Sequence, residues 1–107
     1  MLVWNDYRVV LAIARARKLS AASEALGVTL STVFRRLERI EEQLGTRLFD
    51  RRPGGYIPTE AGKELAHAAE RMEQEALAGD LAVTGRDQRL HGTLRVTATR
   101  LSRARSF

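Results

Sequence analysis

Apolar residues recur with the spacing of an α-helix in three successive segments of the first half of the chain. From Asn5 to about Arg17, apolar side chains occupy positions i, i+3, i+4 and i+7: Tyr7, Val10, Leu11 and Ala14. This spacing places them on one face of a helix, which Asn5 or Asp6 is suited to cap. Trp4, just before the segment, is expected to pack over the end of the core. The pattern predicts a first helix with one buried stripe.

Two further helical segments are separated by a three-residue break, Gly27-Val28-Thr29. Ser20 is expected to cap the first of them, a short helix that ends near Leu26. In the second, apolar residues are spaced by 4, 3 and 4 positions: Val33, Leu37, Ile40 and Leu44. Gly27 can end a helix in the left-handed conformation, and Thr29 can cap the next helix by accepting from its free N–H groups. The three segments predict a helix-turn-helix within a three-helix core.

The polar face of the third helix has the chemistry of a DNA-contacting surface. Opposite the apolar line lie Ser31, Arg35, Glu38, Arg39 and Glu42. The hydroxyl and guanidinium groups are concentrated toward the amino-terminal half, which is the part of a helix that comes closest to bases and phosphates in a major groove. A salt-bridged face exposed to solvent would carry the same charges. The preceding turn favours the DNA interpretation.

After Gly45 the helical period ends, and the sequence predicts a β-hairpin. Residues 47–50 and 56–58 are the extended candidates, and they flank residues 51–55, whose proline and two glycines suit a chain reversal. The expected loop carries Arg51 and Arg52, which are suited to phosphates or to the narrow groove beside the main site. Arginine pairs at loop tips are often without function, so this interpretation depends on the neighbouring helix-turn-helix.

Thr59 is placed to cap a long helix after the hairpin, with Glu60 and Glu64 near the positive end of its dipole. Small and apolar side chains then form a seam with steps of three or four residues: Leu65, Ala68, Met72, Ala76, Gly79 and Val83. This seam buries too little for an isolated helix of this length. It predicts packing against the preceding helices or against the same helix of a second chain, with a lone solvated helix as the alternative.

The end of the chain has a different pattern. Residues 90–99 alternate apolar and polar side chains as a strand does, but the eight residues after them offer no strand to pair with. We therefore expect an orphan strand fragment and a poorly ordered basic tail. The predicted class is mainly α: a winged helix-turn-helix over residues 1–58, a long linker helix over 59–86, and this remainder over 87–107.

Charge changes sign along the 107 residues, whose formal net charge is +5. Residues 1–58 carry a net +4, residues 59–83 a net −4 and residues 84–107 a net +5. A basic head followed by an acidic segment indicates that the head alone faces phosphates, with a generally basic surface as the alternative.

Composition restricts the compartment and the chemistry. The chain has no cysteine, which excludes disulfides, thiolate catalysis and thiolate metal sites. It has no export signal, and no uncharged run approaches the roughly 20 residues of a membrane helix, so a cytoplasmic protein without membrane contact is expected. His67 and His91 have no partners at a metal-binding spacing, and Glu41 and Glu42 are expected to be solvated. No catalytic site and no cofactor are predicted.

The order of these elements, with particular motifs, resembles the N-terminal DNA-binding domain of LysR-type transcriptional regulators. The resemblance covers residues 3–98 and rests on WNDYRVVLAIA (4–14), LSAASEALGV (19–28), TV (32–33), LGTRLFDR (44–51) and TEAG (59–62). It implies a winged helix-turn-helix, a linker helix used for homodimerisation, and recognition of a partly palindromic promoter site in double-stranded DNA. Residues 92–96 resemble the first strand of the family's effector-sensing domain, nearly all of which is missing, so no small-molecule effector site is expected in this chain.

Residues 29–35 depart from the family's common Ser-Gln-Pro-Ala-Val-Ser-Arg. Thr29 keeps the cap, while Leu30 and Phe34 replace a Gln and a Ser that tend to face DNA. Phe34 is suited either to touch a thymine methyl group or to pack into the side of the core. Arg17-Lys18 stands where the family often has a glycine. The predicted major-groove residues are Thr29, Leu30, Ser31, Thr32, Phe34, Arg35 and Arg39, and Arg51 and Arg52 are assigned to the DNA backbone or minor groove.

The leading hypothesis is a dimeric, sequence-selective DNA-binding domain whose affinity falls steeply with salt. The second is an interaction protein that dimerises with full-length regulators through the long helix, without productive DNA binding of its own. A winged-helix regulator of another family is a third possibility. An enzyme is the weakest interpretation.

Overall fold

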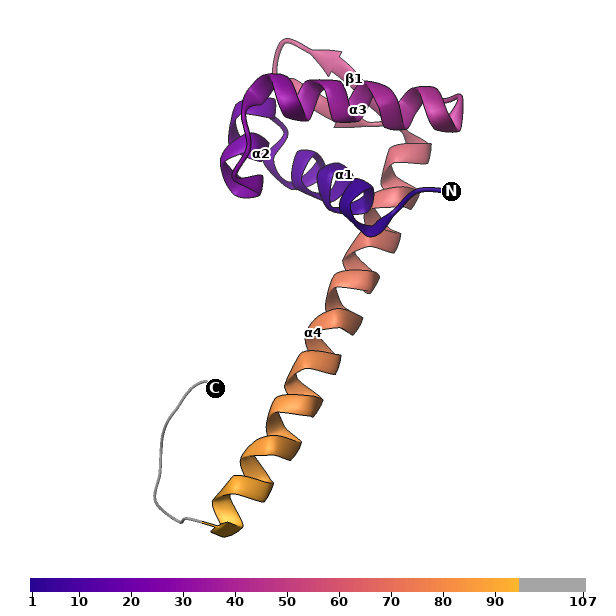
Figure 1. Ribbon diagram of the computed structural model, residues 1–107. Coiled ribbons are helices and arrows are strands. Elements are labelled where there is room, and N and C mark those ends of the chain that lie inside the picture. The colour runs from indigo at the N-terminus through magenta and orange to yellow at the C-terminus, as the bar shows by residue number, and fades with distance from the viewer. Residues whose placement is uncertain (95–107) are drawn as a thin grey trace. The chain divides into compact units, whose positions relative to one another are not determined.

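A computed structural model describes residues 1–94, with the side chains of residues 1–85 (Figure 1). Its elements are α1 (Trp4–Ala16), α2 (Leu19–Leu26), α3 (Leu30–Leu44), β1 (Phe49–Arg52), β2 (Gly55–Pro58) and α4 (Glu60–Leu94). The mainly helical class, the three-helix core, the hairpin wing and the long helix are confirmed. The chain divides into two compact units. The first, Met1–Met72, includes the start of α4, and the second begins at Glu73.

The core of the first unit lies between α1, α2 and α3, each of which contacts the other two (Figure 1). The fully buried apolar side chains come from these helices, from residues 48–49 and from the first part of α4: Val9, Val10, Ile13, Ala22, Val33, Leu37, Ile40, Leu48, Phe49 and Ala69. In α1 the predicted stripe was too narrow, because Val9 and Ile13 are buried while Tyr7 and Ala14 are only half-buried. Since α1 contacts α2, α3 and β2, its buried face is wider than a single line of residues.

Two residues expected in the core are exposed. Trp4 keeps 37% of its surface exposed and Leu44 keeps 41%. Each stands at a helix end, where fewer neighbouring elements cover a side chain. Gly45, in the left-handed conformation (φ 70), ends α3 directly after Leu44.

The first two helices begin at residues other than those predicted. α1 begins at Trp4 after Val3, and Asp6 acts from the third helical position, where its carboxylate accepts from the Val3 N–H (3.2 Å). α2 begins at Leu19 after Lys18, without a side-chain cap. Burial of Leu19 brings that residue into the helix, so the capping preference of Ser20 is not used.

The turn between α2 and α3 forms as predicted. Gly27 is left-handed (φ 71) and its N–H donates to the Glu24 carbonyl (3.2 Å). Thr29 Oγ1 then accepts from the Thr32 N–H (3.2 Å). Both ends of this turn are set by local chemistry, which is why the sequence alone locates it.

The hairpin is tighter than the pattern predicted. β1 and β2 pair antiparallel, with Arg51 opposite Tyr56 and Arg52 opposite Gly55. Both arginines therefore belong to β1 and not to a loop, and the turn is limited to residues 53–54.

A contact with the α1–α2 junction fixes the start of β2. Arg17 closes α1 in the left-handed conformation (φ 66) and, among residues 1–94, is the one non-glycine residue with a positive φ. Its carbonyl accepts from the Tyr56 N–H (2.7 Å). A Cβ on Gly55 (φ 131) would lie 2.5 Å from the same oxygen, so only glycine fits there.

Thr59 caps α4 as predicted, since its Oγ1 accepts from the Gly62 N–H (3.1 Å). The same hydroxyl donates to the Arg47 carbonyl (2.8 Å). α4 continues to Leu94, so the strand expected over residues 90–99 is wrong for residues 90–94. A helix satisfies its own backbone hydrogen bonds, whereas residues 1–94 offer no third strand with which a strand there could pair. The rest of that expected strand and of the basic tail lies outside the described residues.

Candidate nucleic-acid interface

The amino-terminal end of α3 carries a cluster of three hydroxyl groups. Thr29 Oγ1 lies 2.8 Å from Thr32 Oγ1 and 3.3 Å from Ser31 Oγ. Thr29, Leu30 and Ser31 are exposed, and Thr32 is half-buried. The first turn of α3 thus presents hydroxyl groups at the positive end of the helix dipole, which suits a polyanion.

Arg35 extends this polar surface by one helical turn. It is exposed, and within the described part of the chain its side chain has no ion pair or hydrogen bond. Ser31 lies four residues before it and is therefore its neighbour on the helix surface. The five N–H donors of the guanidinium are available for a phosphate or a base edge.

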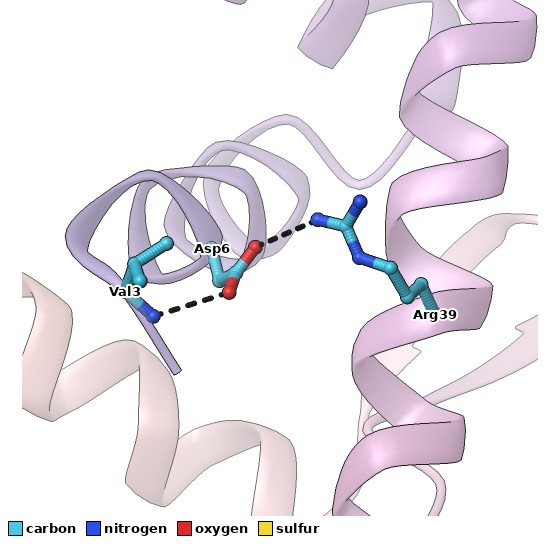
Figure 2. A network of polar contacts seen from close by, with 3 residues as sticks. All are labelled: Val3, Asp6 and Arg39. Carbon is cyan, nitrogen blue, oxygen red and sulfur yellow. Dashed lines mark hydrogen bonds and ion pairs between the residues drawn. The ribbon is translucent and has the colours of Figure 1, made fainter. Parts of the chain in front are cut away.

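Arg39, four residues further along, is held by the fold (Figure 2). Its Nη2 lies 3.2 Å from Asp6 Oδ1, and the Asp6 side chain is only 7% exposed, compared with 62% for Arg39. The other Asp6 oxygen accepts from the Val3 N–H. Arg39 therefore connects α3 to α1 and compensates a buried carboxylate, a partner that the spacing of Arg35 and Arg39 did not reveal.

The two wing arginines differ in their surroundings. The Arg52 Nη2 lies 3.8 Å from Asp50 Oδ2, and both side chains are about half exposed or more. The Arg51 guanidinium carbon instead lies 4.8 Å from the centre of the Phe34 ring and 5.6 Å from that of Tyr56. Arg51 is itself exposed, so an ion can reach it.

Phe34 is half-buried and packs against the core. Of the two sequence-based alternatives, this matches packing into the side of the core. The contact with Arg51 was not predicted, because it depends on the hairpin lying beside α3.

Glu41 was expected to be solvated, and this expectation is wrong. Its Oε2 accepts from the Leu48 N–H (2.8 Å) and the Phe49 N–H (3.4 Å). Glu42, next to it, is exposed. Glu41 thereby ties the carboxyl-terminal half of α3 to the start of the wing.

The predicted seam of α4 divides into two parts. Leu65 and Ala68 are half-buried in the first unit, where Ala66 and Ala69, between and beside them, are buried. Met72 is 37% exposed, Val83 is 60% exposed, and Ala76 and Gly79 are also exposed. Two apolar residues outside the predicted seam, Leu77 and Leu81, are more than half exposed.

The described residues hold no evident metal cluster and no membrane span. Among residues 1–85, no group of three or more His, Cys, Asp or Glu side chains is arranged to hold a metal ion. In the same range, no helix combines the length and the hydropathy that crossing a membrane requires.

The sequence of this chain is similar to those of known transcriptional regulators. Residues 4–63 match the family described as "Bacterial regulatory helix-turn-helix protein, lysR family". The chain is 34% identical over 77 residues to the HTH-type transcriptional regulator CbbR of Rhizobium meliloti, an alignment that covers 72% of this chain and 25% of that relative. The chain spans about a quarter to a third of the length of the curated relatives it matches.

Solved structures of similar fold include LysR-type regulators. Full-length LysG from Corynebacterium glutamicum superposes with a TM-score of 0.74 and 27% identity, over 80% of this chain and 30% of that one. The crystal structure of the CbnR_DBD–DNA complex superposes with a TM-score of 0.66 and 26% identity, over 78% of this chain and 98% of that one.

Proposed function

Because the chain belongs to the lysR family of bacterial regulatory helix-turn-helix proteins, we propose that it binds double-stranded DNA through α3 and the wing, as part of a transcriptional regulator. The observation that carries the proposal is the exposed amino-terminal half of α3, where the Arg35 side chain lies near a cluster of hydroxyl groups and has no partner among residues 1–85. The likeness to a DNA-bound relative supports it. The family consists of regulators, and no catalytic activity is proposed.

The proposed roles follow the position of each side chain. Ser31, Thr32 and Arg35 approach base edges in the major groove, with Thr29 and Leu30 at the rim of the same surface. Arg51 and Arg52 hold phosphates or the adjacent minor groove. Arg39 acts mainly through the fold, because its guanidinium already binds Asp6.

We also propose that two copies pair through α4. Exposed apolar side chains on the part of α4 after residue 72, among them Leu77, Leu81 and Val83, support this because such a surface is stabilised by a partner. Two copies would place two α3 helices on the half-sites of a partly palindromic site.

Selection of bound duplexes from a random pool, followed by titration at several salt concentrations, tests the proposal. We expect enrichment of one sequence with a two-fold repeat, and a linear fall of log affinity with log salt concentration. Failure to enrich any sequence, together with affinity that is insensitive to salt, would contradict the proposal.

The exposed apolar side chains of α4 also favour a second candidate function, association with full-length relatives without DNA binding. A pull-down with an intact relative, beside a gel shift with this chain alone, separates the two. Capture of the relative without any shift of DNA would favour this second function.

A further inference from the structure

One wing arginine is held against two aromatic rings from different elements. The Arg51 guanidinium carbon lies 4.8 Å from the Phe34 ring centre and 5.6 Å from the Tyr56 ring centre. Both distances are within the range in which the negative face of an aromatic ring attracts a cation. Phe34 belongs to α3 and Tyr56 to β2, so the wing and the helix meet at Arg51.

The strand geometry explains why Arg51, and not its neighbour, makes this contact. Arg51 pairs across the hairpin with Tyr56, and side chains two residues apart on a strand share a face. On that face, Phe49 is buried and packs edge-on against Tyr56, with ring centres 6.4 Å apart. Arg52 points to the other face with Asp50, its ion-pair partner.

The rings are themselves fixed. Phe34 and Tyr56 are half-buried and pack against the core. An arginine lying over such rings has little freedom to move, so less conformational entropy is lost when it binds a ligand.

The contact leaves the hydrogen-bonding capacity of Arg51 unused. The cation–π contact attracts the charge of the guanidinium, and none of its five N–H donors makes a hydrogen bond within residues 1–85. Arg51 is exposed, and in the described part of the chain no carboxylate neutralises it. Its charge and its donors are therefore available to a ligand outside the molecule.

We propose that Phe34 is a positioning residue for Arg51: its ring, with that of Tyr56, holds the guanidinium so that the N–H edge meets a phosphate of the DNA backbone beside α3. This rests on the proposed DNA binding. It assigns Phe34 a role that acts through Arg51, in place of the thymine contact considered from the sequence.

A double-mutant cycle tests the coupling. Affinities of the wild type, F34L, R51A and F34L/R51A are measured by fluorescence anisotropy on the selected duplex and on a scrambled one. Leucine keeps apolar bulk but has no aromatic face. We expect F34L to weaken binding to both duplexes by about 3- to 10-fold, with less than about a 2-fold further effect in the R51A background.

Two controls are built into the cycle. F34Y and Y56F keep their rings and are expected to bind like the wild type, and circular dichroism checks that F34L is folded. If F34L does not fold, F34M, which also lacks a ring, replaces it in the cycle and is compared with F34Y and R51A. Selection of duplexes with F34L is expected to return the wild-type sequence, because a phosphate contact carries no sequence information.

A measurement without DNA examines the contact itself. Protons on Arg51 Cδ in the wild type should show an upfield ring-current shift in the NMR spectrum. The shift should shrink in F34L and remain in F34Y. Absence of the shift in the wild type would overturn the proposal.

The outcomes separate the two levels of inference. Lack of DNA binding by the wild type would refute the proposed function. Wild-type binding combined with an unchanged F34L affinity, with an equal F34L effect in the R51A background, or with a new preferred sequence for F34L, would refute the positioning role alone.

Discussion

At the scale of single residues, Arg17 occupies a conformation that disfavours a side chain with a Cβ. It closes α1 with φ 66, which costs a non-glycine residue roughly 1–2 kcal/mol, while the carbonyl must stay in place to accept from Tyr56. We expect Arg17→Gly to change the free energy of unfolding by about 0 to +1 kcal/mol, because relief of strain is partly offset by the greater freedom of glycine in the unfolded chain. Urea unfolding measures the change.

Lys18 provides the matched control for this substitution. Its backbone is extended (φ −129), so Lys18→Gly relieves no strain and is expected to destabilise the protein by a few tenths to about 1 kcal/mol. Equal destabilisation by the two glycine substitutions would show that the left-handed backbone at Arg17 carries no strain.

The two arginines that share the polar face of α3 should separate into different roles. Arg39 binds a buried carboxylate while Arg35 has no protein partner in the described range. We expect Arg39→Ala to lower the free energy of unfolding by about 1–2 kcal/mol, a value reduced by the exposure of Arg39. Arg35→Ala should stay within about 0.5 kcal/mol of the wild type. Thermal or urea unfolding of both variants measures these changes, and equal losses of stability would contradict the separate roles of Arg39 and Arg35.

At the scale of elements, the wing depends on one close backbone approach. A Cβ on Gly55 would lie 2.5 Å from the Arg17 carbonyl oxygen, whereas one on Gly54 would meet open space. We expect Gly55→Ala to destabilise the protein by about 1–3 kcal/mol and Gly54→Ala by no more than about 0.5 kcal/mol. Similar unfolding midpoints for both variants would show that the α1–β2 contact does not form in solution.

The elements that the sequence predicted well are those with local signals at their ends. α3 is bounded by Gly27 and Thr29 at one end and by Gly45 at the other, and the turn before it forms as expected. β2 begins one residue earlier than predicted because its start is set by the Arg17 carbonyl, which lies far away along the chain.

The candidate site was predictable to a similar degree. Ser31 and Arg35 follow from helix periodicity and are exposed, whereas Thr32, in the same hydroxyl cluster, is half-buried. The partners of Arg39, Arg51 and Glu41 could not be predicted, since each joins elements that meet only after folding.

At the scale of the whole molecule, pairing of two copies through α4 can be tested on the exposed part of the predicted seam. Val83 is 60% exposed, and we expect Val83→Glu to shift the protein toward the monomer by placing charge in an apolar contact. Thr84→Glu, at the next exposed position on a different side of the helix, is the control. Sedimentation velocity over a range of concentrations gives the oligomeric state. An oligomeric state unchanged by Val83→Glu would show that Val83 does not lie in the interface between the two copies.

The division of charge along the chain agrees with one DNA-facing region. Residues 1–58 carry a net +4 and residues 59–83 a net −4, and the exposed end of α3 and the wing both belong to the first block. Within that block, substitutions in α3 and in the wing should have different effects. Loss of a base contact made by α3 reduces the difference in affinity between the specific and the scrambled duplex. Loss of a phosphate contact made by the wing lowers the affinity for both duplexes together.

Titration of the wild type, Arg35→Ala and Arg51→Ala against the selected duplex and a scrambled one, at several salt concentrations, is the most direct test. We expect the wild type to prefer the selected duplex by roughly 1,000-fold. Arg35→Ala should lose about 1–3 kcal/mol of that preference, while Arg51→Ala should weaken both complexes alike and reduce the salt slope by about 1. Equal affinity of the wild type for both duplexes, or the same profile for the two variants, would contradict the assignment of α3 as the helix that recognises sequence.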